Sequence, residues 1–421
     1  MPTATSVTSN TVRYRVSPHA PIFKISLLSI ALMLSDVGAV SPVLPDLAAH
    51  YPDQDQASIQ GFISFPAIAA LAATITAGAL ATRVGKRRLV LTGISLIVVG
   101  GLAPIFLIPI TSYPVVLGVR LLAGFGMGLL QPLASSLVAD FYEGQERRTL
   151  LGWQSSMVGA GGIMWSLVVS GLMTFGWMQA FLVYLLGLIM LGLVWRYIPE
   201  PRRAGAPKNA APQDAAPEAA PAPRTRLPRG TIGAVALMFL MTLGFQAMTI
   251  SSPFLASERS LADGSQVSLV MTVFGISSVV AGVLFSTTYR LLGSWTGTAS
   301  LAVLAAGLCL GVASVTLPML FATAVLIGLG FGTYMPFAIN ALNARANESN
   351  SAAATALLFS GAAVAGFSAP YYFKIAGGLV GSTTAATQFA ISAATIVVTL
   401  VLATIYYQID ARWAREQDDQ H

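Results

Sequence analysis

Residues 123–132 read AGFGMGLLQP, and residues 327–336 read IGLGFGTYMP. Both stretches lie within long apolar runs, and their three glycines and one proline match at a single constant offset. Two shorter matches follow in the same order: Ser41-Pro-Val-Leu44 with Ser252-Pro-Phe-Leu255, and Gly78-Ala-Leu80 with Gly282-Val-Leu284. Three ordered matches indicate a duplicated helical unit, which is a known plan of transporters.

The composition indicates a protein whose surface mostly faces lipid. The chain has 421 residues, of which 55% are hydrophobic and 10% charged, and its mean hydropathy is +0.72. Soluble domains carry roughly 25% charged residues. The apolar runs are continuous instead of alternating, which argues against an outer-membrane barrel. We therefore expect membrane-spanning helices.

Runs of spanning length predict an all-α membrane protein with twelve transmembrane helices in two six-helix bundles. The predicted helices lie near 22–47, 58–82, 88–110, 113–140, 150–173, 178–198, 231–255, 266–288, 295–316, 318–343, 352–377 and 383–407. The predicted units are an N-terminal tail (1–21), an N-terminal bundle (22–198), a linker (199–230), a C-terminal bundle (231–407) and a C-terminal tail (408–421). The linker is rich in proline, alanine and charge, so we expect it to be disordered.

Basic residues in the predicted loops fix the expected orientation. With the N-terminus inside, the inner loops hold Arg83, Lys86, Arg87, Arg88, Arg147, Arg148, Arg196, Arg290, Arg345, Arg412, Arg415 and the linker arginines. The outer face then keeps only Arg259 and Lys374. Since inner loops are enriched in Lys and Arg, both tails and the linker are predicted to be cytoplasmic, in a bacterial-type inner (plasma) membrane.

Three motifs resemble the major facilitator superfamily. The loop Gly78-Ala-Leu-Ala-Thr-Arg-Val-Gly-Lys-Arg-Arg88 is similar to its signature G-x-L-a-D-r-x-G-r-[RK]. Arg120-Leu-Leu-Ala-Gly-Phe-Gly-Met-Gly128 resembles its R-x-x-x-G-x-G pattern. The stretch from Asp36 to Pro45 is similar to the helix 1 motif of the 12-helix drug:proton antiporters. The resemblance implies alternating access, with conformational gating by Gly78, Arg83, Gly85, Lys86, Arg87, Gly124 and Gly128.

The chain departs from the family pattern in two places. Thr82 stands where the signature loop usually has an acid. Helix 5 carries Gly162, Ser166, Leu167, Ser170 and Gly171 where the antiporters show G-x-x-x-G-P-x-x-G-G. The basic loop at 83–88 has a simpler explanation as a topology determinant that attracts anionic lipids. The loop at 143–148 is expected to be solvated.

Two ionisable residues lie deep within predicted helices, Asp36 in helix 1 and Arg120 in helix 4. Intramembrane charge is costly and usually functional. Burial would raise the pKa of Asp36 and a nearby guanidinium would lower it, so a modest rearrangement could move it across neutrality. We predict that Asp36 and Arg120 couple transport to protons. The alternatives are a permanent ion pair that packs helix 1 on helix 4, or an Arg120 that polarises the site or binds an anionic substrate.

The predicted substrate site is mainly apolar with a few polar anchors. By family resemblance it is lined by Gln131, Gln154, Trp165, Phe245, Gln246, Thr249, Phe274, Tyr334, Asn340 and Phe359. No cofactor, metal-ligand spacing or catalytic constellation is found, so we predict no enzyme, no nucleic-acid partner and a monomer in contact with lipid. The favoured function is proton-coupled efflux of small amphipathic organic compounds, such as drugs or metabolites. Proton-coupled import of a metabolite is the alternative, and a non-transporting receptor or scaffold is a third.

Overall fold

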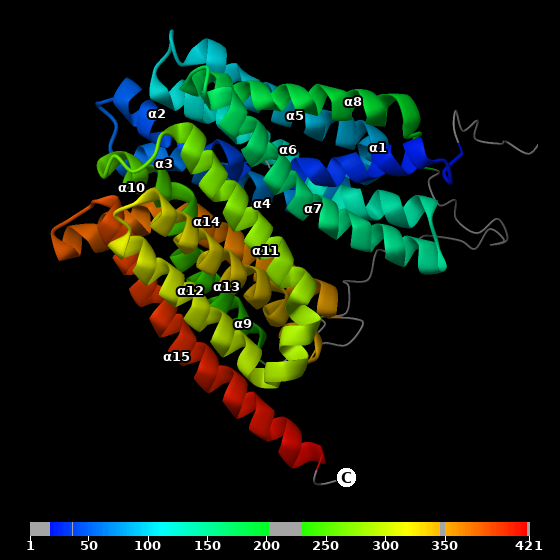
Figure 1. Cartoon of the computed structure of the whole chain (residues 1–421). Coiled ribbons are helices and arrows are strands. Elements are labelled where there is room, and N and C mark those ends of the chain that lie inside the picture. The colour runs from blue at the N-terminus through cyan, green and yellow to red at the C-terminus, as the bar shows by residue number, and fades with distance from the viewer. Residues whose placement is uncertain (1–16, 36, 202–229, 346–349, 419–421) are drawn as a thin grey trace, which may run out of the picture.

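A computed structural model describes residues 17–35, 37–201, 230–345 and 350–418, and side chains at 37, 351–352 and 408–418 are not described. The described part is helical and contains no strand. Two helical bundles, one from each half of the sequence, meet at one end and separate toward the other (Figure 1). This arrangement agrees with the predicted two-bundle fold.

The N-terminal half consists of six spans. Its elements are α1 (Pro21–Leu32), η1 (Met33–Ser35), η2 (Val37–Val43), α2 (Leu44–His50), α3 (Gln56–Ser64), α4 (Pro66–Val84), α5 (Lys86–Leu107), α6 (Tyr113–Phe141), α7 (Gly144–Met173), η3 (Trp177–Leu185) and α8 (Leu186–Tyr197). The first span is broken by two short 3-10 segments between α1 and α2. The break lies between Leu32 and Leu44, where Pro42 also removes a backbone donor.

The C-terminal half repeats this plan. Its elements are α9 (Thr231–Gln246), η4 (Ala247–Ser251), α10 (Ser252–Glu258), α11 (Gly264–Leu292), η5 (Gly293–Trp295), α12 (Thr296–Ala313), α13 (Leu317–Asn343), α14 (Ser351–Val380) and α15 (Ala385–Asp418). Here η4 is a π-helical turn inside the first span of the half. α15 continues to Asp418, beyond the bundle limit predicted at 407.

Eleven segments of the described chain are long and apolar enough to cross a membrane. One of them, Gly264–Ala313, is 50 residues long and contains both α11 and α12. The chain turns between these helices at η5, where Gly293 has a φ of +54°. Divided at this turn, the segment accounts for the twelve predicted spans.

The repeated glycines let the fourth helix of each half approach two neighbours. A Cβ on Gly124 or Gly128 of α6 would lie 2.2 or 2.1 Å from a backbone oxygen of α4, and one on Gly126 would lie 2.4 Å from a backbone oxygen of α5. In α13, Gly328 and Gly332 face α11 in the same way, and Gly330 faces α12. Small residues are the usual means of close helix packing in lipid. In the structure, Gly124 and Gly128, which were predicted as gating residues, contact α4 of their own half.

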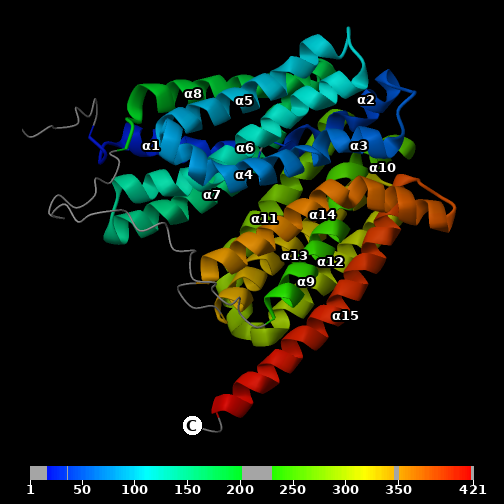
Figure 2. The ribbon, with the colours of Figure 1, turned by 180° about the vertical axis from the view of Figure 1, so that it is seen from behind.

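The main contacts between the two halves are those of α11 with α7 and η2, of α14 with α3 and α4, and of α10 with α2. Figure 2 shows the same arrangement from behind, with α2, α3 and α10 gathered at the joined end. Away from the joined end, α8 of the N-terminal half and α15 of the C-terminal half lie far apart in both views.

We predict that Gly128→Ala lowers the thermal stability of the purified protein, because the added methyl group would overlap the backbone of Ala70. Overpacking of this kind costs about 1–3 kcal/mol. Gly118→Ala on the same helix is the matched control, since a Cβ there meets nothing within 4 Å. Equal melting temperatures of the two variants in detergent would contradict the packing role of Gly128.

Candidate functional site

The joined end of the halves is closed by a buried network of neutral groups. Gln60 Nε2 of α3 donates to the carbonyl of Ile250 at 3.1 Å and to Oε1 of Gln388 at 2.8 Å. Ser251 Oγ donates to the same Gln388 oxygen at 2.6 Å. All three side chains are at most 3% exposed. The network thus joins the second span to the seventh and the twelfth.

Two further contacts flank this network. Lys374 Nζ of α14 lies 2.6 Å from Oδ2 of Asp55, which also caps α3 by accepting from the Ser58 amide. The hydrogen bond from Lys374, followed by that from Ser58, lowers the pKa of the Asp55 carboxyl. On α7, the hydroxyl of Ser170 donates to the carbonyl of Ser265 at 2.9 Å. These groups all belong to the joined end, so the conformation is closed there, and the two bundles diverge toward the other end (Figure 1).

Arg120 is fully buried in the N-terminal half. Its guanidinium carbon lies 5.1 Å from the ring centre of Phe62 and 5.2 Å from that of Tyr184. Phe181 packs on Phe62 and Trp165 on Tyr184, with ring centres 5.8 and 5.7 Å apart. Aromatic faces stabilise a desolvated cation through their quadrupoles. Asp36, the predicted partner of Arg120 in proton coupling, lies outside the described residues.

The predicted substrate residues of the C-terminal half form one aromatic cluster. Phe245 of α9 and Phe274 of α11 lie 5.4 Å apart between ring centres. Phe331 of α13, which the sequence prediction omitted, stacks on Phe245 at 4.5 Å. Beside them, Gln246 lies near Gly366, and Thr249 lies near Gly38 of the opposite half. These five positions come from α9, η4, α11 and α13 of the C-terminal half.

The other predicted substrate residues are dispersed. Gln131, Asn340 and Phe359 are exposed, and Gln154 is buried on α7. Tyr334 is 1% exposed and packs against Phe337. Trp165 is 0% exposed and donates its indole N–H to the carbonyl of Leu32 at 2.7 Å. In this conformation, Trp165 and Tyr334 present no surface to a ligand.

The predicted gating loop is tied to its own half. Lys86 Nζ pairs with both carboxylate oxygens of Asp140 at 2.7 and 2.8 Å. Arg87 donates to the carbonyls of Trp195 and Ile198 at 2.6 Å. Gly85 adopts a φ of +99°, which glycine tolerates at no steric cost. The loop lines a cavity of about 930 Å³, which also includes Gly78, Arg83 and Glu200.

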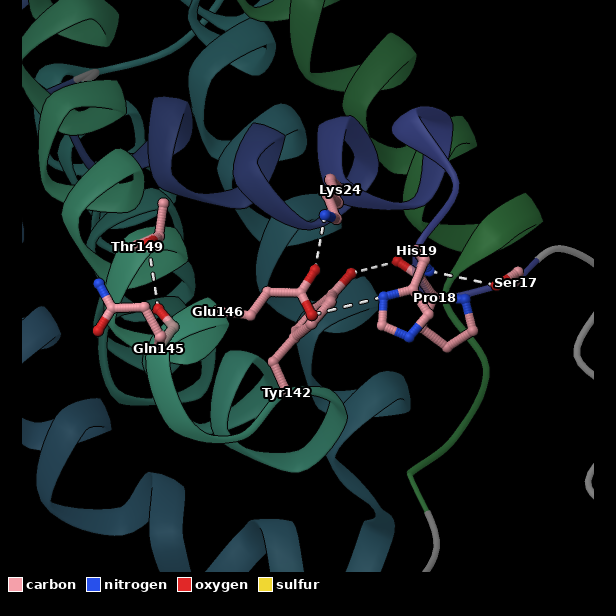
Figure 3. A network of polar contacts seen from close by, with 8 residues as sticks. All are labelled: Ser17, Pro18, His19, Lys24, Tyr142, Gln145, Glu146 and Thr149. Atoms are coloured by element: carbon pink, nitrogen blue, oxygen red, sulfur yellow. Dashed lines mark hydrogen bonds and ion pairs between the residues drawn. The ribbon is translucent and has the colours of Figure 1, made fainter.

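A second polar network joins the start of α1 to the loop between α6 and α7 (Figure 3). Lys24 Nζ lies 2.7 Å from Oε1 of Glu146, and His19 Nδ1 lies 3.4 Å from its Oε2. Tyr142 donates its hydroxyl to the carbonyl of Pro18. Burial raises the pKa of Tyr142 to about 12, so it stays a donor at neutral pH. Tyr142 in the loop and Glu146 in the first turn of α7 are thus tied to the start of α1, and Glu146 stays at the surface, as expected for a solvated segment.

Comparison with known proteins agrees with this architecture. A model of the Major Facilitator Superfamily matches residues 26–296. The crystal structure of a D-xylose-proton symporter superposes with a TM-score of 0.71 at 16% identity, over 91% of this chain and 97% of that one. A bacterial homologue of the human lysosomal transporter Spinster, inward-facing and occupied, gives 0.70 at 16% identity, over 94% and 98%.

A third solved structure, of the nucleoside transporter NupG, superposes with a TM-score of 0.69 at 15% identity, over 91% of this chain and 99% of that one. A comparison with curated protein sequences finds no match. The structural likenesses at this identity establish the fold, and the family match extends over more than half of the chain. The chain belongs to the Major Facilitator Superfamily and is a multi-pass membrane transporter of that type.

Proposed function

We propose that this transporter exports small amphipathic organic compounds in exchange for protons. The observation that carries the proposal is the conformation itself: the halves are joined at one end by neutral hydrogen bonds and separated at the other. Rocking of two such halves about a central site is the mechanism of alternating access. A fully buried guanidinium in the N-terminal half supplies the charge that coupling to an ion requires.

The open end is assigned to the cytoplasm. Arg83, Arg147, Arg290 and Arg345 follow spans that end there, whereas the closed end has the acidic Asp55. Because cytoplasmic loops are enriched in basic residues, the conformation is inward-facing and both termini are cytoplasmic. We place the protein in a bacterial-type inner membrane, as a monomer in contact with lipid.

The substrate class follows from the cluster of Phe245, Phe274 and Phe331. Stacked aromatic rings offer a flat apolar surface with a negative face, which suits organic cations and planar rings. Gln246 and Thr249 beside the cluster add neutral polar anchors. A mostly apolar pocket with few polar groups is typical of small organic ligands. Trp165 and Tyr334 would reach such a ligand only after the helices repack.

Proton coupling is assigned to Asp36 together with Arg120. The aromatic cage keeps Arg120 away from water, so its charge acts at full strength on neighbouring groups. A carboxyl group in such surroundings changes its proton affinity when its distance from the guanidinium changes. Asp36 takes up a proton when the site faces outward and releases it when the site faces inward.

Proton-coupled import is the second candidate, for two reasons. In α7 the glycine-rich pattern of antiporters is replaced by Gly162, Ser166, Leu167, Ser170 and Gly171. One structural relative is titled a D-xylose-proton symporter. Uptake into everted and right-side-out vesicles separates the two directions: export predicts proton-driven accumulation in everted vesicles, and import predicts it in right-side-out vesicles.

We predict that Asp36→Asn abolishes proton-driven accumulation of substrate while leaving the protein folded, because the side chain can no longer carry a proton. The substrate is a compound that stabilises the purified wild-type protein in a thermal-shift screen of drug-like cations, sugars and metabolites. Asp53→Asn, in the exposed segment between α2 and α3, is the matched control. An Asp36→Asn protein that still concentrates the compound against a gradient would disprove the assignment.

We predict that Gln60→Ala shifts the population toward the form that is open at the joined end, because the closed form loses two buried hydrogen bonds. With each bond worth about 0.5–1.5 kcal/mol net, the shift is about tenfold. Spin labels at Asp53→Cys and Thr383→Cys in a Cys309→Ala background report the distance between the halves.

Gln56→Ala, one helical turn earlier, is the control for Gln60→Ala, because the Gln56 amide nitrogen has no hydrogen-bond partner among the residues that the structure describes. Identical distance distributions for the two variants would mean that the Gln60 bonds do not hold the end closed.

We predict that the contribution of the Asp55–Lys374 pair to this closure does not change between pH 8 and 5. The pKa of Asp55 is lowered, so its contribution is complete above its usual pKa near 4 and is lost only as the pH falls through the lowered value. The same spin labels test this, and Asp55→Asn should show an equal, few-fold shift at both pH values. The prediction would be refuted if the wild type opened between pH 7 and pH 5 and Asp55→Asn did not.

A further inference from the structure

One face of α7 holds the break in the first span. Val158, Gly161, Gly162 and Trp165 recur at the spacing that places residues on a single helical face. The Trp165 indole donates to the carbonyl of Leu32, the last residue of α1, at 2.7 Å. The carbonyl of Val158 accepts a hydrogen bond from Ser35 Oγ at 2.8 Å.

The contact at Gly161 leaves no room for a side chain. A Cβ there would lie 2.6 Å from the Leu32 oxygen and 3.1 Å from the Leu32 Cα. At Gly162, a Cβ would be 3.6 Å from the Cβ of Ser35. The backbone of α7 therefore lies directly against Leu32, which precedes η1, and close to Ser35, which ends it.

Trp165 also contacts the cage of Arg120. Its ring centre is 5.7 Å from that of Tyr184, which in turn lies 5.2 Å from the Arg120 guanidinium carbon. Trp165 is thus the one residue of this α7 face that touches both the helix break and the wall of the cage. Its side chain is fully buried, so it cannot move without displacing one of the two.

The neighbouring face of α7 forms the interface with the other half. A Cβ on Gly275 of α11 would contact Ile163, and a Cβ on Gly159 would lie 2.7 Å from the Val279 side chain. Further along, Ser170 bonds to Ser265, and Met173 reaches Gly264. α7 therefore packs both on the break in span 1 and on α11, and η2 itself also touches α11.

We propose that α7 links the break in span 1 mechanically to the interface between the halves, with Trp165 as the positioning residue. The bond from Trp165 to Leu32 is made in the inward-facing form and is released when the joined end opens. This inference rests on the proposed alternating access and extends it to the site at residue 36. A half that moved as a rigid body would keep the bond in both forms.

The test is Trp165→Phe, which keeps an aromatic ring but removes the N–H donor and part of the indole volume. We expect the population open at the joined end to rise by about a few-fold, read from spin labels at Asp53→Cys and Thr383→Cys in the substrate-free Cys309→Ala protein. Trp153→Phe is the matched control, because Trp153 lies on the same helix and is 51% exposed. The control should leave the distances unchanged.

A second pair of variants keeps the test decisive if Trp165→Phe does not fold. Gly161→Ala would force Leu32 away from α7, whereas Gly171→Ala on the same helix meets nothing within 4 Å. A larger population open at the joined end in Gly161→Ala, with no change in Gly171→Ala, supports the link. Populations equal to those of the controls in both Trp165→Phe and Gly161→Ala would overturn it.

The readout uses neither substrate nor a proton gradient, so it is independent of the direction of transport and of coupling through Asp36. A shifted population together with proton-independent transport would reject the proposed function and leave the link intact. Proton-driven export with an unshifted population would reject the link and leave the proposed function intact.

Discussion

Within hydrocarbon, every backbone N–H and C=O must find a partner inside the protein, and the two broken spans of this chain show how that constraint shapes the site. In span 1 the carbonyl of Leu32, at the break, accepts the indole N–H of Trp165 from the same half. In span 7 the carbonyl of Ile250, within the π-helical turn, accepts Gln60 Nε2 from the opposite half. In this conformation one break is stabilised from within its own half, and the other from the opposite half.

Duplication explains the frame of the molecule but not its chemistry. The glycines of α6 and α13 pack against equivalent helices in the two halves, and this packing is the part that the repeat preserves. The functional groups are not repeated. The N-terminal half has a buried guanidinium beneath Phe62 and Tyr184, whereas the C-terminal half has stacked phenylalanines around Phe245.

Hydropathy and the repeated glycines were enough to predict the spans and the two bundles, because these depend on local composition and helical period. They could not pair Gln60 with Gln388, or Lys24 with Glu146, since such contacts join segments far apart in the sequence. Phe331 was not predicted as a site residue, although it lies within the repeated glycine stretch. Its stacking on Phe245 joins positions far apart in the sequence and is visible only in the folded structure. Trp165 was predicted as a ligand contact, but its N–H is occupied by a backbone carbonyl, which no sequence pattern signals.

The choice of groups at the joined end fits a structure that must open. A buried ion pair is costly to form, and breaking it strands charges in a low-dielectric interior. Amides and hydroxyls lose only about 0.5–1.5 kcal/mol per bond when water replaces the partner. Gln60, Gln388 and Ser251 therefore provide a closing energy of a few kcal/mol, the range in which two conformations can interconvert. The ion pair of Lys374 and Asp55 lies at the rim, where both groups remain partly solvated in either form, so opening never leaves a charge without water or a partner.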